Sequence, residues 1–495
     1  MENKKQIKYI YIFNIALCFF LLVYGLICGV SGNDFWWHLK TGEWIITNGK
    51  IPHMDVFSWY GTANNYIWYA HEWLSDVIYY LIYNTIGRIG ITFISILLIG
   101  FHHLFLMKIT EKYWAKYTNI SFLWFFYHAT ILLLVLQCRP YIFSFIFLDI
   151  ELYLLTRFLE EDNFKGIFFV PLLGMLWSNM HGGSSNLSYI IFGIFLLIGA
   201  LDNFDFYKLE HRKLSKEKLK ILGITFVLTI LSLFLNPYGI EMLIYPYRYM
   251  LVSNFDRQVI GEWAPIDLKT DVGLIMIVMF AALLIILIIT EKKIKAIDFV
   301  LFGAFTYLLF QSIRFGYFFF IVASYIIFRY MPEKVNDFIK ESIIKYACIG
   351  ASILILIAGT LFLSISDFKY VKTTLSDEFV EVIKESGNER LFNAYELGEE
   401  LIFNDIPVFI DSRADVYSLN GDVLIHAYAL YKLNPTYIEE IRHEFFGVDY
   451  FFDEVYGFDS AVVPAYIPIS TYLDKREDFV KVYEENNIIY WERIK

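Results

Sequence analysis

Ionisable side chains alternate with tryptophans in one long polar segment, residues 33–74, which follows the first apolar run of the chain. This segment holds six of the 11 tryptophans, together with Asp34, His38, Asp55, His71 and Glu72. Tryptophan is enriched where a surface is half apolar and half wet, as at a membrane–water interface. The pattern therefore predicts chemistry at a bilayer surface, on a lipid-linked substrate.

Asp34 is the candidate for catalysis, because it stands directly after an apolar run and so at the depth of lipid head groups. A carboxylate there can act as a general base on an acceptor hydroxyl. Aspartate before Phe-Trp-Trp-His-Leu is also a good helix N-cap. The two roles are compatible, and the sequence leaves both open.

His38, Asp55, His71 and Glu72 are candidates for substrate binding in the same segment. His71 and Glu72 precede another apolar stretch, residues 73–86. This pair could bind a divalent cation with Asp34 or Asp55, hydrogen-bond a phosphate, or cap the next helix. The chain has no HExxH or comparable metal-ligand spacing. No cofactor is therefore certain, and a divalent cation stays an option.

Arg139 and Arg314 occupy very short turns between apolar runs. Arginine at bilayer depth is costly and is usually paired. Its planar guanidinium fits two oxygens of a phosphate at once. We therefore expect these arginines to bind a phosphate, or to pair with an internal carboxylate such as Glu262, which is itself a candidate binding residue.

Three further candidates lie in the middle and near the end of the chain. His181 precedes Gly182 and Gly183, and glycines at such a turn allow the close approach of a ligand or of another backbone segment. Asp411 and Arg413 follow a short apolar stretch, a place where α/β domains often carry ligand residues. An internal Asp–Arg pair explains these two residues equally well.

Composition indicates a membrane protein, because the 495 residues are 57% hydrophobic and only 19% charged. Runs of about 20 apolar residues span a bilayer. We predict about 11 spans, near residues 9–30, 89–108, 120–136, 140–157, 166–178, 187–201, 219–235, 272–290, 296–311, 315–331 and 345–366. The first run is too long for the apolar part of a signal peptide and is expected to be an uncleaved helix.

Charge and cysteine content argue against a nucleic-acid-binding or disulfide-rich protein, and the charges of the loops predict the orientation in the membrane. The net charge of -11 comes without a basic stripe or a nucleic-acid motif, and the four scattered cysteines form no disulfide framework. Alternate loops hold most of the lysines and arginines, which predicts a cytoplasmic N-terminus and an outward C-terminus. The motif-like polar segments then share the outer face: 34–72, 137–140, 179–183, 236–265, 311–314 and everything after Ser366.

The last segment, from about Thr373, has no span and mixes short apolar runs with charges. We predict strands at 391–395 and 407–411, a helix at 397–404, and a hairpin around Asn486-Asn487. The expected domains are a transmembrane domain, 1–371, with a long first outer loop, 31–88, and a small extracytoplasmic α/β domain, 372–495.

Several motifs resemble the bacterial multi-pass membrane glycosyltransferases of the GT-C superfamily. They are Asp34-Phe-Trp-Trp-His-Leu, Thr41-Gly42, Gly49-Lys-Ile-Pro52, Asp55-Val-Phe-Ser58, His71-Glu-Trp-Leu74, Trp177-Ser-Asn-Met-His-Gly-Gly183, Asn236-Pro-Tyr-Gly239, Glu262-Trp263 and Phe409-Ile-Asp-Ser-Arg-Ala-Asp-Val-Tyr417. The resemblance implies a GT-C-like helical fold, a sugar donor on a polyprenyl phosphate, and a catalytic acid in the first outer loop, which maps onto Asp34. Relatives often carry Asp-Pro-Asp where this chain has Gly32-Asn33-Asp34.

The expected function is that of an inverting glycosyltransferase in a bacterial plasma membrane, which transfers a sugar to an extracytoplasmic glycan, lipid or protein and binds no nucleic acid. The alternatives are a transporter or flippase for lipid-linked sugars, and a polymerase or ligase of surface polysaccharide. A transporter should carry ionisable residues near the bilayer midplane. The sequence shows no evident midplane acid, and His102 and His103, inside an apolar run, are expected to pack or to hydrogen-bond between helices.

Overall fold

The computed structural model describes residues 2–28, 34–134, 136–162, 164–252, 255–338, 341–365, 373–433 and 447–494. Gly32 and Asn33, the positions that depart from the Asp-Pro-Asp triplet, lie outside these residues. The chain forms two compact units. Unit 1 comprises residues 1–30, 88–243 and 257–370, and unit 2 comprises residues 31–87, 244–256 and 371–495.

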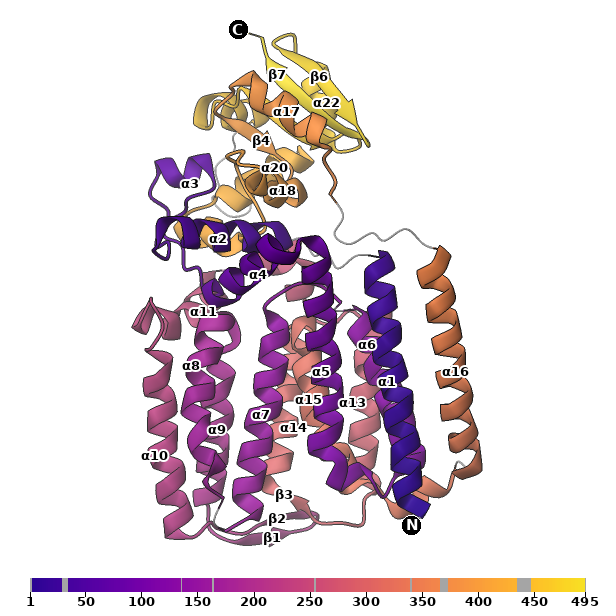
Figure 1. Ribbon diagram of the computed structural model, residues 1–495. Coiled ribbons are helices and arrows are strands. Elements are labelled where there is room, and N and C mark those ends of the chain that lie inside the picture. Colours follow the sequence, from indigo (N-terminus) through magenta and orange to yellow (C-terminus); the bar gives the residue numbers. More distant parts are fainter. Residues whose placement is uncertain are drawn as a thin grey trace. The chain divides into compact units, whose positions relative to one another are not determined.

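Unit 1 is a bundle of helices that lie side by side (Figure 1). Each of the 11 predicted spans corresponds to one helix: α1 (Glu2–Cys28), α5 (Arg88–Trp114), α6 (Thr118–Leu134), α7 (Tyr141–Glu160), α8 (Val170–Met180), α9 (Asn186–Ala200), α10 (Lys216–Leu233), α13 (Asp271–Ile289), α14 (Ala296–Gln311), α15 (Gly316–Tyr330) and α16 (Glu341–Ile365). Among the described residues, five helical segments are long and apolar enough to cross a membrane: Lys4–Ile27, Arg88–Trp114, Gly182–Ala200, Asp271–Ile289 and Ile313–Tyr330.

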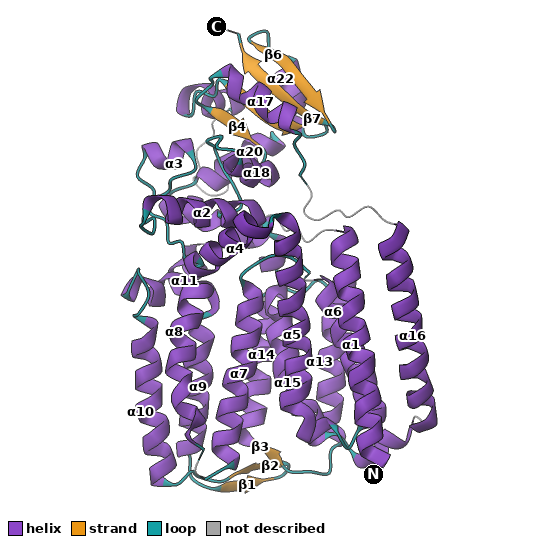
Figure 2. Ribbon diagram, viewed as in Figure 1, coloured by secondary structure: helices purple, strands orange, loops and turns teal. Residues whose placement is uncertain are grey.

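Short elements join these helices. A small sheet at one end of unit 1 pairs β1 (Phe204–Phe206) with β2 (Leu209–His211), and β2 with β3 (Ile294–Lys295) (Figure 2). The other connections contain α12 (Asp256–Val259) and the 3₁₀ turns η1 (Lys165–Phe169), η2 (Gly182–Ser184), η3 (Gly261–Trp263), η4 (Ile313–Phe315) and η5 (Glu333–Phe338).

Unit 2 joins three segments that are far apart in the sequence. The first contributes α2 (Phe35–Asn48), α3 (Trp59–Ala63) and α4 (Trp73–Ile86), and the second contributes most of α11 (Ile240–Val252). The third contributes α17 (Asp377–Ser386), η6 (Tyr395–Leu397), α18 (Gly398–Phe403), α19 (Ala414–Asn420), α20 (Val423–Lys432), the π-helical turn η7 (Tyr450–Val455) and α22 (Pro468–Asp474). The long first loop, which the sequence grouped with the transmembrane region, therefore packs with the C-terminal segment.

A mixed four-stranded sheet forms the rest of the third segment. Its order is β4 (Leu391–Asn393), β5 (Ser460–Pro464), β7 (Ile488–Arg493) and β6 (Phe479–Glu485). β4 and β5 are parallel, and the other pairs are antiparallel. Asn486 and Asn487 both have positive φ, so the predicted β6–β7 hairpin turn is confirmed.

The predicted strand at 407–411 is wrong. Val408 instead forms an isolated parallel bridge with Ser58, and its amide donates to the carbonyl oxygen of Phe57. Phe409 and Ile410 are buried as a strand would be, but their amides face the side-chain oxygen of Asn393. The apolar pattern of residues 407–411 thus predicted their burial correctly, but these residues do not pair with a strand of the sheet.

A buried polar network links helices inside unit 1. Nε2 of His103 on α5 lies 2.8 Å from Oδ1 of Asn14 on α1, and its Nδ1 lies 2.9 Å from Nδ1 of His128 on α6. The Asn14 amide nitrogen donates to the carbonyl oxygen of Ile10, so Oδ1 must accept from His103. A neutral His103 then accepts from His128, and the expected hydrogen-bonding role of His103 is confirmed.

Acidic residues also lie inside the bundle, contrary to the expectation from sequence. Oδ2 of Asp149, near the middle of α7, lies 2.8 Å from Nδ1 of His102. Glu151, two residues further on, is fully buried. The apolar residues around both acids hid them in the sequence pattern. The bundle core is therefore partly polar, and its helices are paired by specific hydrogen bonds.

We expect Asn14→Leu to lower the stability of the bundle by about 1 kcal/mol, because the buried N–H of His103 loses its acceptor. The measurement is thermal unfolding of the purified protein in detergent, followed by tryptophan fluorescence. Ile12→Leu, at an exposed site on the same helix, is the control and should unfold like the wild type. An unchanged Asn14→Leu protein would show that the network contributes no net stability.

Candidate active site

Helices α2 and α4 approach closely enough to hold the polar residues of the first loop in fixed positions. A Cβ atom added to Gly42 of α2 would lie 2.2 Å from the carbonyl oxygen of Asp76 on α4. Only glycine therefore permits this contact. The hydroxyl of the preceding residue, Thr41, donates to the carbonyl oxygen of Trp37, one turn earlier on α2.

Asp34 stands at the start of α2. Its carbonyl oxygen accepts from the amide of His38, 3.2 Å away, which begins the helix. The Asp34 backbone already has helical angles, φ -86° and ψ -6°, and its side chain makes no capping hydrogen bond to α2. The structure thus does not show the capping role that the sequence left open, and Asp34 remains the proposed general base.

His38 is held by Asp76 of α4 and lies near Glu72, the residue before that helix. Its Nδ1 lies 2.7 Å from Oδ1 of Asp76, and its Nε2 lies 3.7 Å from Oε2 of Glu72. Burial lowers the pKa of His38 to about 4, although Glu72 opposes this shift, and burial raises the pKa of Asp76. His38 is therefore neutral at pH 7 and acts as a hydrogen-bonding group, not as a cation for phosphate.

Asp76 is a buried residue of this cluster that the sequence analysis missed. It stands four positions after Glu72, so both carboxylates lie on one face of the same helical turn. That spacing was a usable signal, but the surrounding residues 73–86 were treated only as an apolar stretch.

His71 lies in a different environment from His38. Its ring centroid is 5.1 Å from that of Tyr245 on α11, and its Nδ1 is 3.1 Å from the carbonyl oxygen of Tyr69. Tyr245 in turn donates to Oδ2 of Asp415, 2.9 Å away. Among the described residues, no three His, Cys, Asp or Glu side chains are arranged to hold a metal.

Asp55, Asp411 and Arg413 form a closed ion triad in the interior of unit 2. Nη1 of Arg413 donates to Asp55 at 2.8 Å, and its Nη2 and Nε donate to Asp411 at 2.6 and 2.8 Å. The guanidinium also lies over the rings of Phe57 and Trp68. All three charged side chains are fully buried, so this is the internal Asp–Arg pair that the sequence offered as the alternative to ligand binding.

Arg139 and Arg314 converge on one carboxylate of unit 1. Nη1 of Arg139 lies 2.8 Å from Oε2 of Glu262, and Nη1 of Arg314 lies 3.7 Å from Oε1. Burial would raise the pKa of Glu262, but the two guanidinium groups outweigh it and lower the pKa to about 2. The cluster carries two positive charges and one negative charge, and its side chains are partly exposed. It can therefore still attract an anion.

His181 takes part in a hydroxyl network between α7, α8 and η2. Its Nδ1 lies 2.6 Å from Oγ of Ser144 and 2.8 Å from Oγ of Ser184. The indole N–H of Trp177 donates to the same Ser144 hydroxyl at 2.8 Å. These contacts bury the imidazole and fix the turn.

Two solved structures share this fold. One is a crystal structure of the Archaeoglobus fulgidus oligosaccharyltransferase tethered with an acceptor peptide, with a TM-score of 0.51 and 13% identity over 92% of this chain and 68% of that chain. The other is the archaeal oligosaccharyltransferase AglB from A. fulgidus in complex with an inhibitory peptide and a dolichol-phosphate, with a TM-score of 0.51 and 10% identity over 92% and 69% of the two chains. No protein-family model and no curated protein matches the sequence.

The chain is thus a multi-pass helical membrane protein with an AglB-like fold and a small C-terminal mixed sheet. The architecture expected from the GT-C resemblance is confirmed at the level of the fold.

We expect Arg413→Met to destabilise unit 2 by about 3–5 kcal/mol, because Asp55 and Asp411 would remain buried without a counter-charge. The measurement is urea unfolding followed by tryptophan fluorescence, since Trp68 lies against the guanidinium. Arg476→Met is the matched control: Arg476 pairs with Asp453 and Asp478 near the surface, so its loss should cost only about 1 kcal/mol. Equal losses in both variants would contradict a dominant role for the triad.

Proposed function

We propose that this chain is an inverting membrane glycosyltransferase that transfers a sugar from a polyprenyl-phosphate donor to an extracytoplasmic glycan, lipid or protein. One observation carries the proposal. In a fold shared with an oligosaccharyltransferase, Asp34 stands at the start of α2, one turn before His38, and Asp76 of α4 fixes His38. Preorganised carboxylates suit proton removal from a hydroxyl.

The proposed reaction has one displacement step. Asp34 takes the proton of the acceptor hydroxyl, whose oxygen forms a bond to the anomeric carbon of the donor sugar. The bond from that carbon to the phosphate oxygen breaks, and the polyprenyl phosphate leaves with the electron pair. Glu72, whose Oε2 lies 3.7 Å from Nε2 of His38, orients the acceptor, and no step passes through a metal.

Phosphate binding is the role that we propose for Arg139 and Arg314. The leaving phosphate gains negative charge in the transition state, and fixed guanidinium groups stabilise such charge. Glu262 orients both arginines and leaves the cluster with one net positive charge. We place this reaction on the outer face of a bacterial plasma membrane, as the distribution of basic loops predicts.

A transporter of lipid-linked sugars is the second candidate, and the buried acids of α7 are the observation that favours it. Asp149 and Glu151 lie where transporters keep ionisable groups. His102 neutralises or shares the charge of Asp149, however, as a structural network also would. A transporter would not need Asp34 for bond formation, so variants of Asp34 separate the two functions.

Asp34→Asn should slow sugar transfer by roughly 10²–10⁴, the usual contribution of a general base, without loss of folding. The assay is transfer from a polyprenyl-phosphate sugar by protein reconstituted in vesicles. Glu43→Gln is the control and should retain activity, because Glu43 is a half-buried acid of the same helix that pairs with Lys40. Near-normal transfer by Asp34→Asn would refute the assignment, and a larger loss in Glu72→Gln would move the base to position 72.

Arg139→Lys and Arg314→Lys should raise the KM for the donor, because lysine cannot make the two-point contact with phosphate. Glu262→Gln provides the discriminating comparison. If the arginines bind phosphate, removing the competing carboxylate should leave the donor KM equal or lower. If they serve only to pair with Glu262, all three variants should lose stability and none should change the donor KM.

A further inference from the structure

One buried acid of unit 1 has no part in the proposed transfer reaction. Glu151 lies on α7 and is fully buried. Both of its carboxylate oxygens lack a hydrogen-bond partner within the described part of the chain. A buried acceptor that is left without a donor costs free energy, and an ionised carboxylate in that position costs far more. The carboxyl group is therefore suited to a ligand from outside the chain.

Asp149, two residues earlier on the same helix, provides a direct comparison. Its Oδ2 lies 2.8 Å from Nδ1 of His102 on α5, so a basic group is available to it. Two residues correspond to about 200° of rotation around an α-helix, so the two acids face opposite sides of α7. Asp149 thus has a basic partner on its side of the helix, whereas no described residue provides one for Glu151.

The side of α7 that carries Glu151 faces α9. Among the described residues, the hydroxyl of Ser188 on α9 is the one polar side chain that acts on the Glu151 carboxyl, although the two groups are not in hydrogen-bond geometry. Ser188 is itself fully buried, and its Oγ has no partner in the same part of the chain. Two unsatisfied polar groups from two helices thus face each other in the interior of the bundle.

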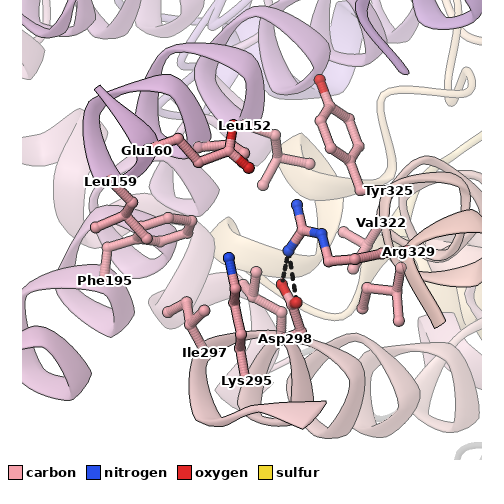
Figure 3. A pocket seen from close by; sticks show the side chains of 13 residues that line it. Leu152, Leu159, Glu160, Phe195, Lys295, Ile297, Asp298, Val322, Tyr325 and Arg329 are labelled. Carbon is pink, nitrogen blue, oxygen red and sulfur yellow. Dashed lines mark hydrogen bonds and ion pairs between the residues drawn. The ribbon is translucent and has the colours of Figure 1, made fainter. Parts of the chain in front are cut away.

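No charged group of the described residues compensates an ionised Glu151. α8, which also packs on α7, has no ionisable side chain, and α9 has only Tyr189. Figure 3 shows a small pocket that is lined by Leu152, the residue after Glu151, and Glu151 itself does not line it. The arginine of that pocket, Arg329, is already paired with Asp298. The Glu151 carboxyl therefore lies in a part of the bundle without a counter-charge.

The number of available oxygens indicates which ligand fits. Calcium takes about six to eight oxygen ligands and magnesium about six. Glu151 and Ser188 offer only two carboxylate oxygens and one hydroxyl. A proton needs a single oxygen, and it removes the charge that burial penalises. Ionisable side chains inside a membrane bundle are known as carriers of protons.

We propose that Glu151 binds a proton between α7 and α9, where the hydroxyl of Ser188 faces it. The neutral acid needs no counter-charge, so the two helices can pack around it. The site is independent of Asp34 and of the Arg139–Arg314 cluster, so it is present whether or not the chain transfers sugar.

Infrared spectroscopy of the full chain in vesicles tests for the proton, because a carboxylic acid and a carboxylate absorb at different frequencies. At pH 7 we expect the wild type to show a carboxylic-acid band, one component of which is lost in Glu151→Gln. Glu151→Leu should lose the same component, so the result does not depend on one variant. Asp149→Asn is the matched control, because it changes the buried acid on the opposite face of α7 and should retain that component.

Three results would overturn the proposal. An unchanged carboxylic-acid band in both Glu151 variants would mean that Glu151 carries no proton. Loss of the same component in Asp149→Asn would place the proton on the His102 side of α7. Disappearance of the component when Na⁺ is added at constant pH would assign the carboxylate to a metal cation. None of these measurements involves sugar transfer, so their outcome is separate from the test of the transferase.

Discussion

The buried ion triad of Asp55, Asp411 and Arg413 is the interaction on which the architecture of unit 2 depends. Removing three charges from water is expensive, and only close mutual pairing offsets the cost. Here Arg413 satisfies both carboxylates with three N–H groups, while Tyr417 donates to Asp411. Because Asp55 belongs to the first loop and the other residues to the last segment, neither segment can reach this state alone.

Other contacts join the same two segments, the first loop and the C-terminal segment. The indole of Trp37 donates to the hydroxyl of Ser412, the indole of Trp59 donates to the carbonyl oxygen of Leu391, and Ser58 bridges Val408. Tryptophans that the sequence suggested for a membrane interface thus also serve as donors in a protein core. α2 therefore has a fixed support, and Gly42 lets α4 bring Asp76 and Glu72 to His38.

The sequence predicted the helices of unit 1 well, because length and apolar composition alone decide whether a segment can span a bilayer. It also located the β6–β7 hairpin, since the Asn486-Asn487 turn is a local signal. The sequence did not predict most of the pairs that form between segments distant in the chain. Nothing local tells that Val408 pairs with Ser58 instead of a sheet neighbour, or that Asp149 meets His102. The pairing of Arg139 and Arg314 with Glu262 was one of the two alternatives that the sequence offered. The four-residue spacing from Glu72 could have identified Asp76 as a member of the site.

The hydrogen bond between Asp55 and Arg413 has a consequence for biosynthesis, because 358 positions of chain separate the two residues. Ribosomes add about 5–20 residues per second, so the first loop is complete roughly 20–70 s before its partner exists. During that interval its carboxylate, its tryptophans and its edge at Ser58 have no native counterpart. All bundle helices except α1 are synthesised within this window, so unit 2 can mature only after they have been made. A chain that stops short of Arg413 would leave the segment from α2 to α4 without its core, however well the membrane helices had inserted.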